Sequence, residues 1–179
     1  MKYSRIIKYS FLTSLLGVFL LFSAFQIMHD WKIKSDYNIK FVHEDADGIF
    51  GKFTGKIVFD ESKPEAASFD IAIDVKSVET GNSLQNESIV SDSWLNAEKY
   101  PTITFKAEGA KKVGENWETT GILFLHGIEK EITVPFTFGS TADGGLFESN
   151  FSLAFIDFKL SDDPEEKITL QLKVPVSKD

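Results

Sequence analysis

The sequence predicts an all-β protein whose strands close into an antiparallel barrel. Apolar and polar residues alternate with a period of two in several segments, which is typical of strands with one buried face. Clusters of Gly, Asn, Asp and Ser separate these segments and supply turns. We count about eight strands, a number whose barrel can hold one small ligand. No repeat and no linker interrupts the 179 residues, so one such domain is expected.

Composition narrows the classes of partner. The chain has no cysteine, and its 17 phenylalanines outnumber four tyrosines and three tryptophans, which favours an apolar interior over hydrogen-bonded ligand recognition. Its net charge is −8, although residues 1–28 carry only the basic Lys2, Arg5 and Lys8. A strongly acidic body repels phosphate backbones, so we expect no nucleic-acid partner.

Residues 1–28 have the layout of an export signal or of an N-terminal membrane anchor. Basic residues come first, and the uncharged apolar stretch 11–28 follows. Its length lies between that of a signal-peptide core and that of a membrane-spanning hydrophobic helix, so both alternatives stay open. In either case we expect residues 29–179 to form the barrel domain in the periplasm or another extracytoplasmic compartment. Association with the inner membrane would use residues 11–28.

The first half of the domain reads as strands joined by turns. Alternation predicts strands at residues 31–41, 53–59 and 69–75, with a turn at residues 43–48. The glycine at position 55 fits a strand that is sharply bent or closely approached by another.

The alternation stops in the connection, residues 79–99, which we expect to be structured. Asn82 has the chemistry of a helix N-cap, so a short helix is predicted to begin there. Leu84, Ile89 and Trp94 are expected to face inward. The connection is therefore predicted to lie at one mouth of the barrel.

Strands resume after the connection and continue to the C-terminus. The run 122–125 is apolar on both faces, which predicts a cover packed outside the barrel. Pro135 lies opposite the apolar face of its strand and indicates an edge or a bulge. A change of phase after Phe155 indicates a β-bulge, and residues 168–176 alternate most cleanly.

Catalytic and metal-binding patterns are scarce. The histidines, His29, His43 and His126, lack metal-ligand spacing, and the last two are expected to cap strand ends. Residues 45–48 match the start of a calcium loop but lack its remaining ligands. No nucleotide-binding or nucleophile-elbow motif occurs. We therefore expect that the protein is not an enzyme and that it binds neither a metal nor another cofactor. A Ser/His/Asp triad assembled in space, from residues far apart in the sequence, stays open as an alternative.

Four sets of residues resemble motifs of the YceI-like family and occur in the same order as in that family. They are residues 77–82, residues 100–105, residues 121–127, and an opening set made of Trp31, His43, Gly51, Phe53, Gly55 and Phe59. The resemblance covers Trp31 to the C-terminus, and it implies a lipocalin-like barrel around an apolar cavity that binds polyisoprenoid lipids. Members of the family usually carry Arg, Asp and His in the connection, whereas this chain has Gln85, Asn86 and Ser88 there. Any role of the family's Arg, Asp and His is therefore not assigned to this chain.

The resulting hypothesis is an exported, non-enzymatic carrier of a long apolar lipid, a polyisoprenoid or an isoprenoid quinone. Burial of each methylene contributes about 0.8 kcal/mol, so a prenyl tail needs few polar contacts. The predicted ligand-binding residues lie on the apolar strand faces and in the connection: Phe41, Phe53, Ile71, Ile73, Trp94, Leu95, Phe105, Leu123, Phe136, Phe151, Phe155, Leu170 and Leu172.

Two alternatives stay open. The same residues would form the core of a filled barrel, an exported stress or interaction module without a small ligand. An enzyme acting on a lipid or quinone would need a polar group facing the cavity, and His43 and His126 are the candidates. The oligomeric state is left open as well, a homodimer included.

Overall fold

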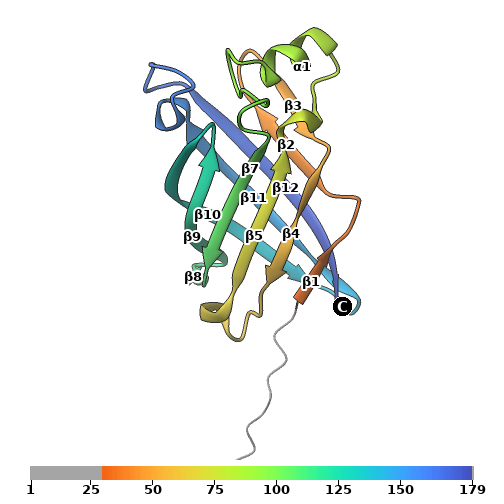
Figure 1. Cartoon of the computed structure of the whole chain (residues 1–179). Coiled ribbons are helices and arrows are strands. Elements are labelled where there is room, and N and C mark those ends of the chain that lie inside the picture. The colour runs from red at the N-terminus through yellow and green to blue at the C-terminus, as the bar shows by residue number, and fades with distance from the viewer. Residues whose placement is uncertain (1–29, 179) are drawn as a thin grey trace, which may run out of the picture.

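The structure is a computed structural model that describes residues 30–178, and these form a closed antiparallel β-barrel of eight strands (Figure 1). The predicted fold class is confirmed. The segments predicted as an export signal or hydrophobic anchor, residues 1–28, lie outside the described residues. Among residues 30–178, no helix has the length and apolarity needed to cross a membrane.

The strand segments carry twelve labels because some barrel strands are interrupted. β1 with β2, β3 with β4, and β5 with β6 each make one interrupted barrel strand, and β8 is a short ribbon on β9. Their bounds are β1 (Asp30–Ile33), β2 (Asn38–Val42), β3 (Asp47–Phe50), β4 (Phe53–Val58), β5 (Ser68–Asp74), β6 (Val78–Glu79), β7 (Thr102–Glu108), β8 (Lys111–Val113), β9 (Asn116–Leu125), β10 (Ile128–Ser140), β11 (Gly144–Ala154) and β12 (Lys167–Lys178).

The barrel closes through β1, which pairs with both β4 and β12. β12 is long enough to pair with the whole of β11 on one edge and with β2 and then β1 on the other. From β4 the order runs through β5, β7, β9, β10 and β11 back to β12. Closure removes the free sheet edges that would otherwise invite aggregation.

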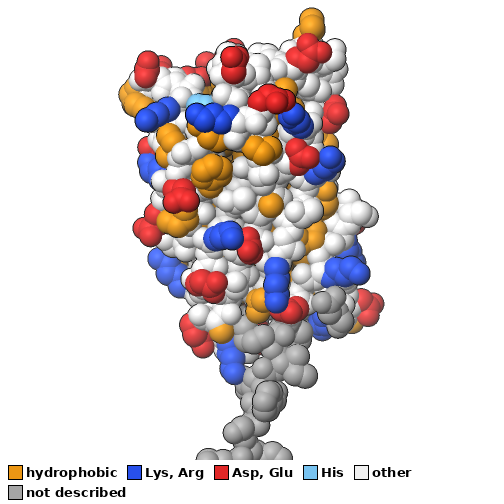
Figure 2. All heavy atoms as spheres, viewed as in Figure 1, with side chains coloured by type: hydrophobic (Ala, Val, Ile, Leu, Met, Phe, Trp, Pro, Cys, Tyr) orange, Lys and Arg blue, Asp and Glu red, His pale blue; other side chains and the backbone are white. Residues whose placement is uncertain are grey.

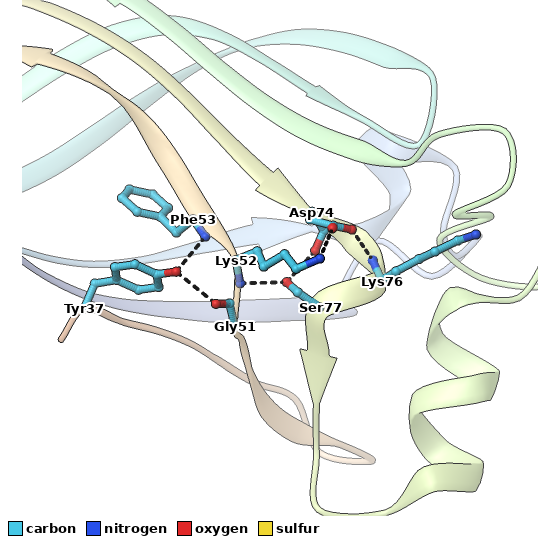
Figure 3. Close-up of polar contacts among 7 residues, drawn as sticks. All are labelled: Tyr37, Gly51, Lys52, Phe53, Asp74, Lys76 and Ser77. Carbon is cyan, nitrogen blue, oxygen red and sulfur yellow. Dashed lines mark hydrogen bonds and ion pairs between the residues drawn. The ribbon is translucent and has the colours of Figure 1, made fainter. Parts of the chain in front are cut away.

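A polar cluster holds the break between β3 and β4 (Figure 3). The Tyr37 hydroxyl donates to the Gly51 carbonyl (2.9 Å) and accepts from the Phe53 amide (3.1 Å). The Lys52 amide donates to Ser77 Oγ (3.0 Å). Backbone groups that the interrupted strands leave unpaired are thereby satisfied.

The end of the barrel at which β1 begins (Figure 1) holds a cluster of aromatic rings, and we call it the aromatic end. The Trp31 indole donates to the Phe59 carbonyl (2.8 Å), which fixes the chain there. The Phe59 side chain is 0% exposed, and its ring lies edge-on to four neighbours at centroid distances of 5.3–5.7 Å: Trp117, Phe136, Phe138 and Phe147. Such pairs contribute about 0.5–1.5 kcal/mol each beyond their burial.

The opposite end carries the connection and helix α1 (Ser83–Val90) (Figure 1). The Asn82 side chain accepts hydrogen bonds from the amides of Leu84 (3.0 Å) and Gln85 (3.3 Å), so the predicted N-cap is present. Ile89 is buried as predicted, but the prediction for Leu84 is wrong, because its side chain is 74% exposed. The helix has only eight residues and sits on the rim, so its first turn points to solvent.

Two predictions for the later strands are also corrected. Ile122 is 42% exposed, so the expected outer cover of β9 is absent at that residue. Only the next outward residue, Phe124, meets a ring, that of Tyr100, at 6.3 Å. After β11 the chain forms a short 3-10 helix, η3 (Phe155–Phe158), instead of a β-bulge, and this turn buries both terminal phenylalanines.

The outer face of the barrel is polar, and its charges are mixed. Acidic and basic side chains are interspersed on the face shown in Figure 2, with hydrophobic side chains visible between them. Cross-strand ion pairs such as Lys106–Asp70 (3.4 Å) and Lys173–Glu148 (2.9 Å) lie on the outer surface of the barrel. Exposed pairs of this kind contribute about 0–1 kcal/mol, so they serve solubility more than stability.

Candidate ligand-binding cavity

A hollow of about 180 Å³ lies inside the barrel, between the aromatic end and the connection. Its wall is almost wholly apolar, and Thr119, Glu148 and Ser149 are the polar residues among residues 30–178 that line it. The carboxylate of Glu148 is paired with Lys173 on the outer face. Pockets for drug-sized ligands usually measure about 300–1,000 Å³. In this conformation the hollow therefore has room for a segment of a long hydrocarbon, not for all of it.

Every residue predicted to bind ligand lies on the wall of this cavity. The strands supply most of them, the connection supplies two and η3 supplies one: Phe41, Phe53, Ile71, Ile73, Trp94, Leu95, Phe105, Leu123, Phe136, Phe151, Phe155, Leu170 and Leu172. The structure thus brings together residues that are separated by as much as the whole domain in sequence.

Strand register explains how the wall forms. In β5, Ile71 and Ile73 face Phe105 and Ile103 of β7 on one side, and Ile73 faces Phe53 of β4 on the other. Because side chains alternate between the two faces of a strand, pairing in this register puts all of these residues on the inner face. A shift of the strand register by one residue would turn the apolar side chains of the shifted strand to the outer face.

The roof closes the cavity opposite the aromatic end and consists of Ile89, Trp94, Leu95, Phe155 and Leu160. The Leu95 amide donates to the Ile89 carbonyl (3.0 Å), which folds the chain after α1 back over the barrel. The Trp94 ring then meets the Phe155 ring edge-on at 5.6 Å. The roof therefore joins the connection to η3 across the barrel mouth.

Neither His43 nor His126 lies on the cavity wall. The His43 side chain is 6% exposed, stacks on Phe155 at 5.1 Å and lies 3.4 Å from a Glu166 oxygen. His126 occupies the turn between β9 and β10, where Nδ1 is 3.0 Å from the Phe158 carbonyl oxygen. Both histidines follow strand ends, as predicted, and neither supplies the cavity-facing polar group that the enzyme alternative requires.

Polar chemistry at the wall is limited. The Thr119 hydroxyl donates to the Gly109 carbonyl (2.7 Å). A hydrogen bond of 2.7 Å between Lys76 and Glu98 raises the pKa of the lysine and lowers the pKa of the glutamate, but neither residue lines the cavity. Among residues 30–178, no three His, Asp or Glu side chains gather where they could hold a metal ion. What the wall offers is apolar burial.

Sequence reasoning did not name part of the wall. Several of the missing residues lie on the same alternating faces and were within reach of the period-two pattern: Ile57, Phe69, Ile103, Leu125, Ile132, Val134, Leu153, Ile168 and Val174. Ile89 was predicted to face inward but was not included among the ligand-binding residues. Others depend on bends or on three-dimensional packing, and no local pattern marks them: Phe50, Thr119, Phe147, Glu148, Ser149 and Leu160.

Comparison with known proteins adds family and fold. A family model described as a YceI-like domain matches residues 31–177. A UPF0312 protein from Pseudomonas putida is 31% identical over 154 residues, which are 82% of this chain and 78% of that protein.

Two solved structures share the fold. The crystal structure of Burkholderia cenocepacia BcnA matches with a TM-score of 0.76 at 20% identity, covering 80% of this chain and 99% of that one. A polyisoprenoid binding domain from Saccharophagus degradans matches with a TM-score of 0.62 at 12% identity, covering 86% and 100%. At these identities the likeness concerns the fold alone.

Proposed function

The chain belongs to the YceI-like domain family, and from that premise we propose that it is an exported carrier that holds an apolar lipid in its barrel. The ligand class is a polyisoprenoid or an isoprenoid quinone. The observation that carries the proposal is the cavity wall, which is apolar on every strand of a closed barrel. The polyisoprenoid-binding domain from Saccharophagus degradans, which has the same fold, supports the ligand class.

The energetics favour a hydrocarbon ligand. Burying about ten methylene groups contributes roughly 8 kcal/mol, which corresponds to a micromolar dissociation constant before the costs of immobilisation. A cavity of this size is also unfavourable when empty. At about 24 cal/mol per Å³, the 180 Å³ hollow costs roughly 4 kcal/mol of stability, which an apolar ligand would recover in part.

Binding without catalysis is part of the proposal. The polar residues of the wall are Thr119, Glu148 and Ser149. Both hydroxyls already donate to backbone carbonyls, and the Glu148 carboxylate is paired with Lys173. Export is proposed from the layout of residues 1–28. Without them the chain has 16 basic and 27 acidic residues, a net −11, which keeps a lipid-loaded carrier soluble.

Organic extraction of the purified protein, followed by mass spectrometry, tests the function. Protein from a host rich in prenyl lipids should release about one lipid molecule per chain, and native mass spectrometry should report the same adduct. The control is Leu84→Ser, which removes an exposed leucine outside the barrel and should leave the lipid bound. Protein that is empty from such a host, and that takes up no added prenyl lipid, would contradict the carrier proposal.

The filled-barrel alternative draws support from the aromatic end, where four rings pack around the fully buried Phe59. It predicts that no apolar molecule enters the native protein. The uncharged fluorescent probe N-phenyl-1-naphthylamine distinguishes the two, because its emission rises only when it moves into an apolar site.

A further inference from the structure

Backbone pairing between β10 and β11 stops partway along both strands. Residues 137–140 of β10 pair with residues 145–148 of β11, and there the ladder ends. The rest of β10, residues 128–136, pairs with β9, whereas the rest of β11, residues 149–154, pairs with β12. No backbone pair joins these two segments, and we call the unpaired seam between them the slot.

Pro135 explains why the ladder ends at this point. Its carbonyl accepts a hydrogen bond from Ser149 Oγ (2.5 Å), so the polar edge of residue 135 faces β11. A proline has no N–H to donate on that edge, so the next ladder bond cannot form. The Ser149 hydroxyl takes the place of a backbone donor and satisfies the Pro135 carbonyl. No ladder bond then holds the residues beyond Pro135 to β11. The edge position predicted from Pro135 is confirmed in this sense.

The slot has firm boundaries. At one end lies the β10–β11 ladder itself. At the other end η3 crosses toward β10, where Lys130 forms an ion pair with Asp157 and His126 is bonded to the Phe158 carbonyl. The stretch without backbone pairing is therefore bounded at both ends by these contacts.

A shallow groove of about 390 Å³ lies against the barrel wall at the ladder end of the slot. It shares four wall residues with the cavity: Phe136, Glu148, Ser149 and Leu172. Its other residues are more polar: Asn116, Pro135, Thr137, Asn150, Gln171 and Lys173. The inner and outer spaces are thus neighbours across the point at which the ladder ends.

The chemistry of the groove is polar but neutral. Within residues 30–178, the side chains of Asn116, Thr137, Asn150 and Gln171 form no hydrogen bonds to the protein, so they can donate to and accept from a ligand. The one charged pair, Lys173 and Glu148, already cancels at 2.9 Å. A phosphorylated head would meet the Glu148 carboxylate and would have to displace it from Lys173.

We propose that the lipid of the proposed function leaves the barrel sideways through the slot, with an uncharged, hydrogen-bonding head in the groove. This rests on the proposed function and narrows its ligand to prenyl alcohols or quinones, as against prenyl phosphates. The cavity volume supports it, because 180 Å³ is too small for a long prenyl chain and the remainder must lie outside. At the roof, by contrast, the connection and η3 pack against each other through the Trp94 and Phe155 rings.

A cross-link tests the route. The chain has no cysteine, so two can be introduced selectively. Thr133→Cys and Ser152→Cys replace one exposed residue on each side of the slot. A short bifunctional thiol-reactive cross-linker then joins them after the protein is loaded with geranylgeraniol. Exchange of the bound alcohol should slow by about tenfold or more, because the slot can no longer widen. The matched control, Ser152→Cys with Thr169→Cys, joins residues that already pair in the β11–β12 ladder and should leave the exchange rate unchanged.

Head-group preference tests the groove. Geranylgeraniol and geranylgeranyl diphosphate have the same tail, and the alcohol should displace N-phenyl-1-naphthylamine at about tenfold lower concentration because the groove disfavours a second anion. Glu148→Gln frees Lys173 and should remove most of this preference. Asp70→Asn, which frees Lys106 from an ion pair elsewhere on the barrel, should leave it intact.

The outcomes separate the two proposals. If the protein binds the alcohol but the slot cross-link leaves the exchange rate unchanged, the slot is not the exit route. If the alcohol and the diphosphate bind equally well, the groove does not hold the head. In both cases the carrier function stands. Failure of the unmodified protein to bind either compound would overturn both proposals together.

Discussion

The two ends of the barrel interior use the same kind of residue to opposite effect. At the aromatic end, rings from β9, β10 and β11 converge on Phe59, whose side chain is fully buried. Toward the roof, Phe53 and Phe105 share the wall with Ile71, Ile73 and other aliphatic side chains, and a hollow remains. The barrel is therefore tightly packed around Phe59 and hollow along the stretch where phenylalanines share the wall with aliphatic side chains.

The difference predicts unequal sensitivity to truncation, and this is the largest effect we expect. Phe59→Ala should lower the free energy of unfolding by about 3–5 kcal/mol, because the surrounding rings cannot close the space. Phe105→Ala should cost less, because its side chain already borders a hollow. Urea unfolding followed by circular dichroism measures both, and equal losses would break the distinction between the two ends.

Ligand should stabilise one end more than the other. Geranylgeraniol at about one hundred times its dissociation constant should raise the free energy of unfolding by about 2.7 kcal/mol. Hydrogen exchange should show the added protection in α1, the roof and the strands beside the slot, with little change around Phe59. Protection spread evenly over the barrel would argue against a ligand confined to the hollow.

The smallest effect concerns the cap of α1. Asn82→Ala removes the side-chain acceptor for two helix amides and should cost about 1 kcal/mol. Because α1 sits on the rim, we expect this loss as faster hydrogen exchange in α1, with the global midpoint almost unchanged. Asn82→Asp keeps the acceptor and serves as the control. A matching loss of global stability would mean that the helix unfolds only with the barrel.

The alternation of apolar and polar residues along each strand was enough to predict the fold and most residues of the cavity wall. A strand such as β5 shows its inner face in its own sequence, so Ile71 and Ile73 could be assigned without knowing their neighbours. The helix cap was likewise visible at Asn82. These features depend on residues close together in the chain.

The errors arise where the answer depends on a distant segment. Leu84 and Ile122 look like buried residues locally, but no other element covers them. Pro135 indicated an interrupted edge, yet only the register of β10 against β11 shows that the interruption is a slot beside the cavity. The volume of the hollow depends on which side chains face each other across the barrel, and a period of two does not encode that.

The most direct test of the account is to fill the hollow from within. Leu123→Trp adds bulk on the cavity side of β9, and Ile122→Trp adds the same bulk on the outer face of the same strand. Geranylgeraniol binding should weaken by more than about tenfold in the first variant and stay unchanged in the second, with thermal unfolding confirming that both fold. Undiminished binding in folded Leu123→Trp would show that the lipid does not occupy the barrel.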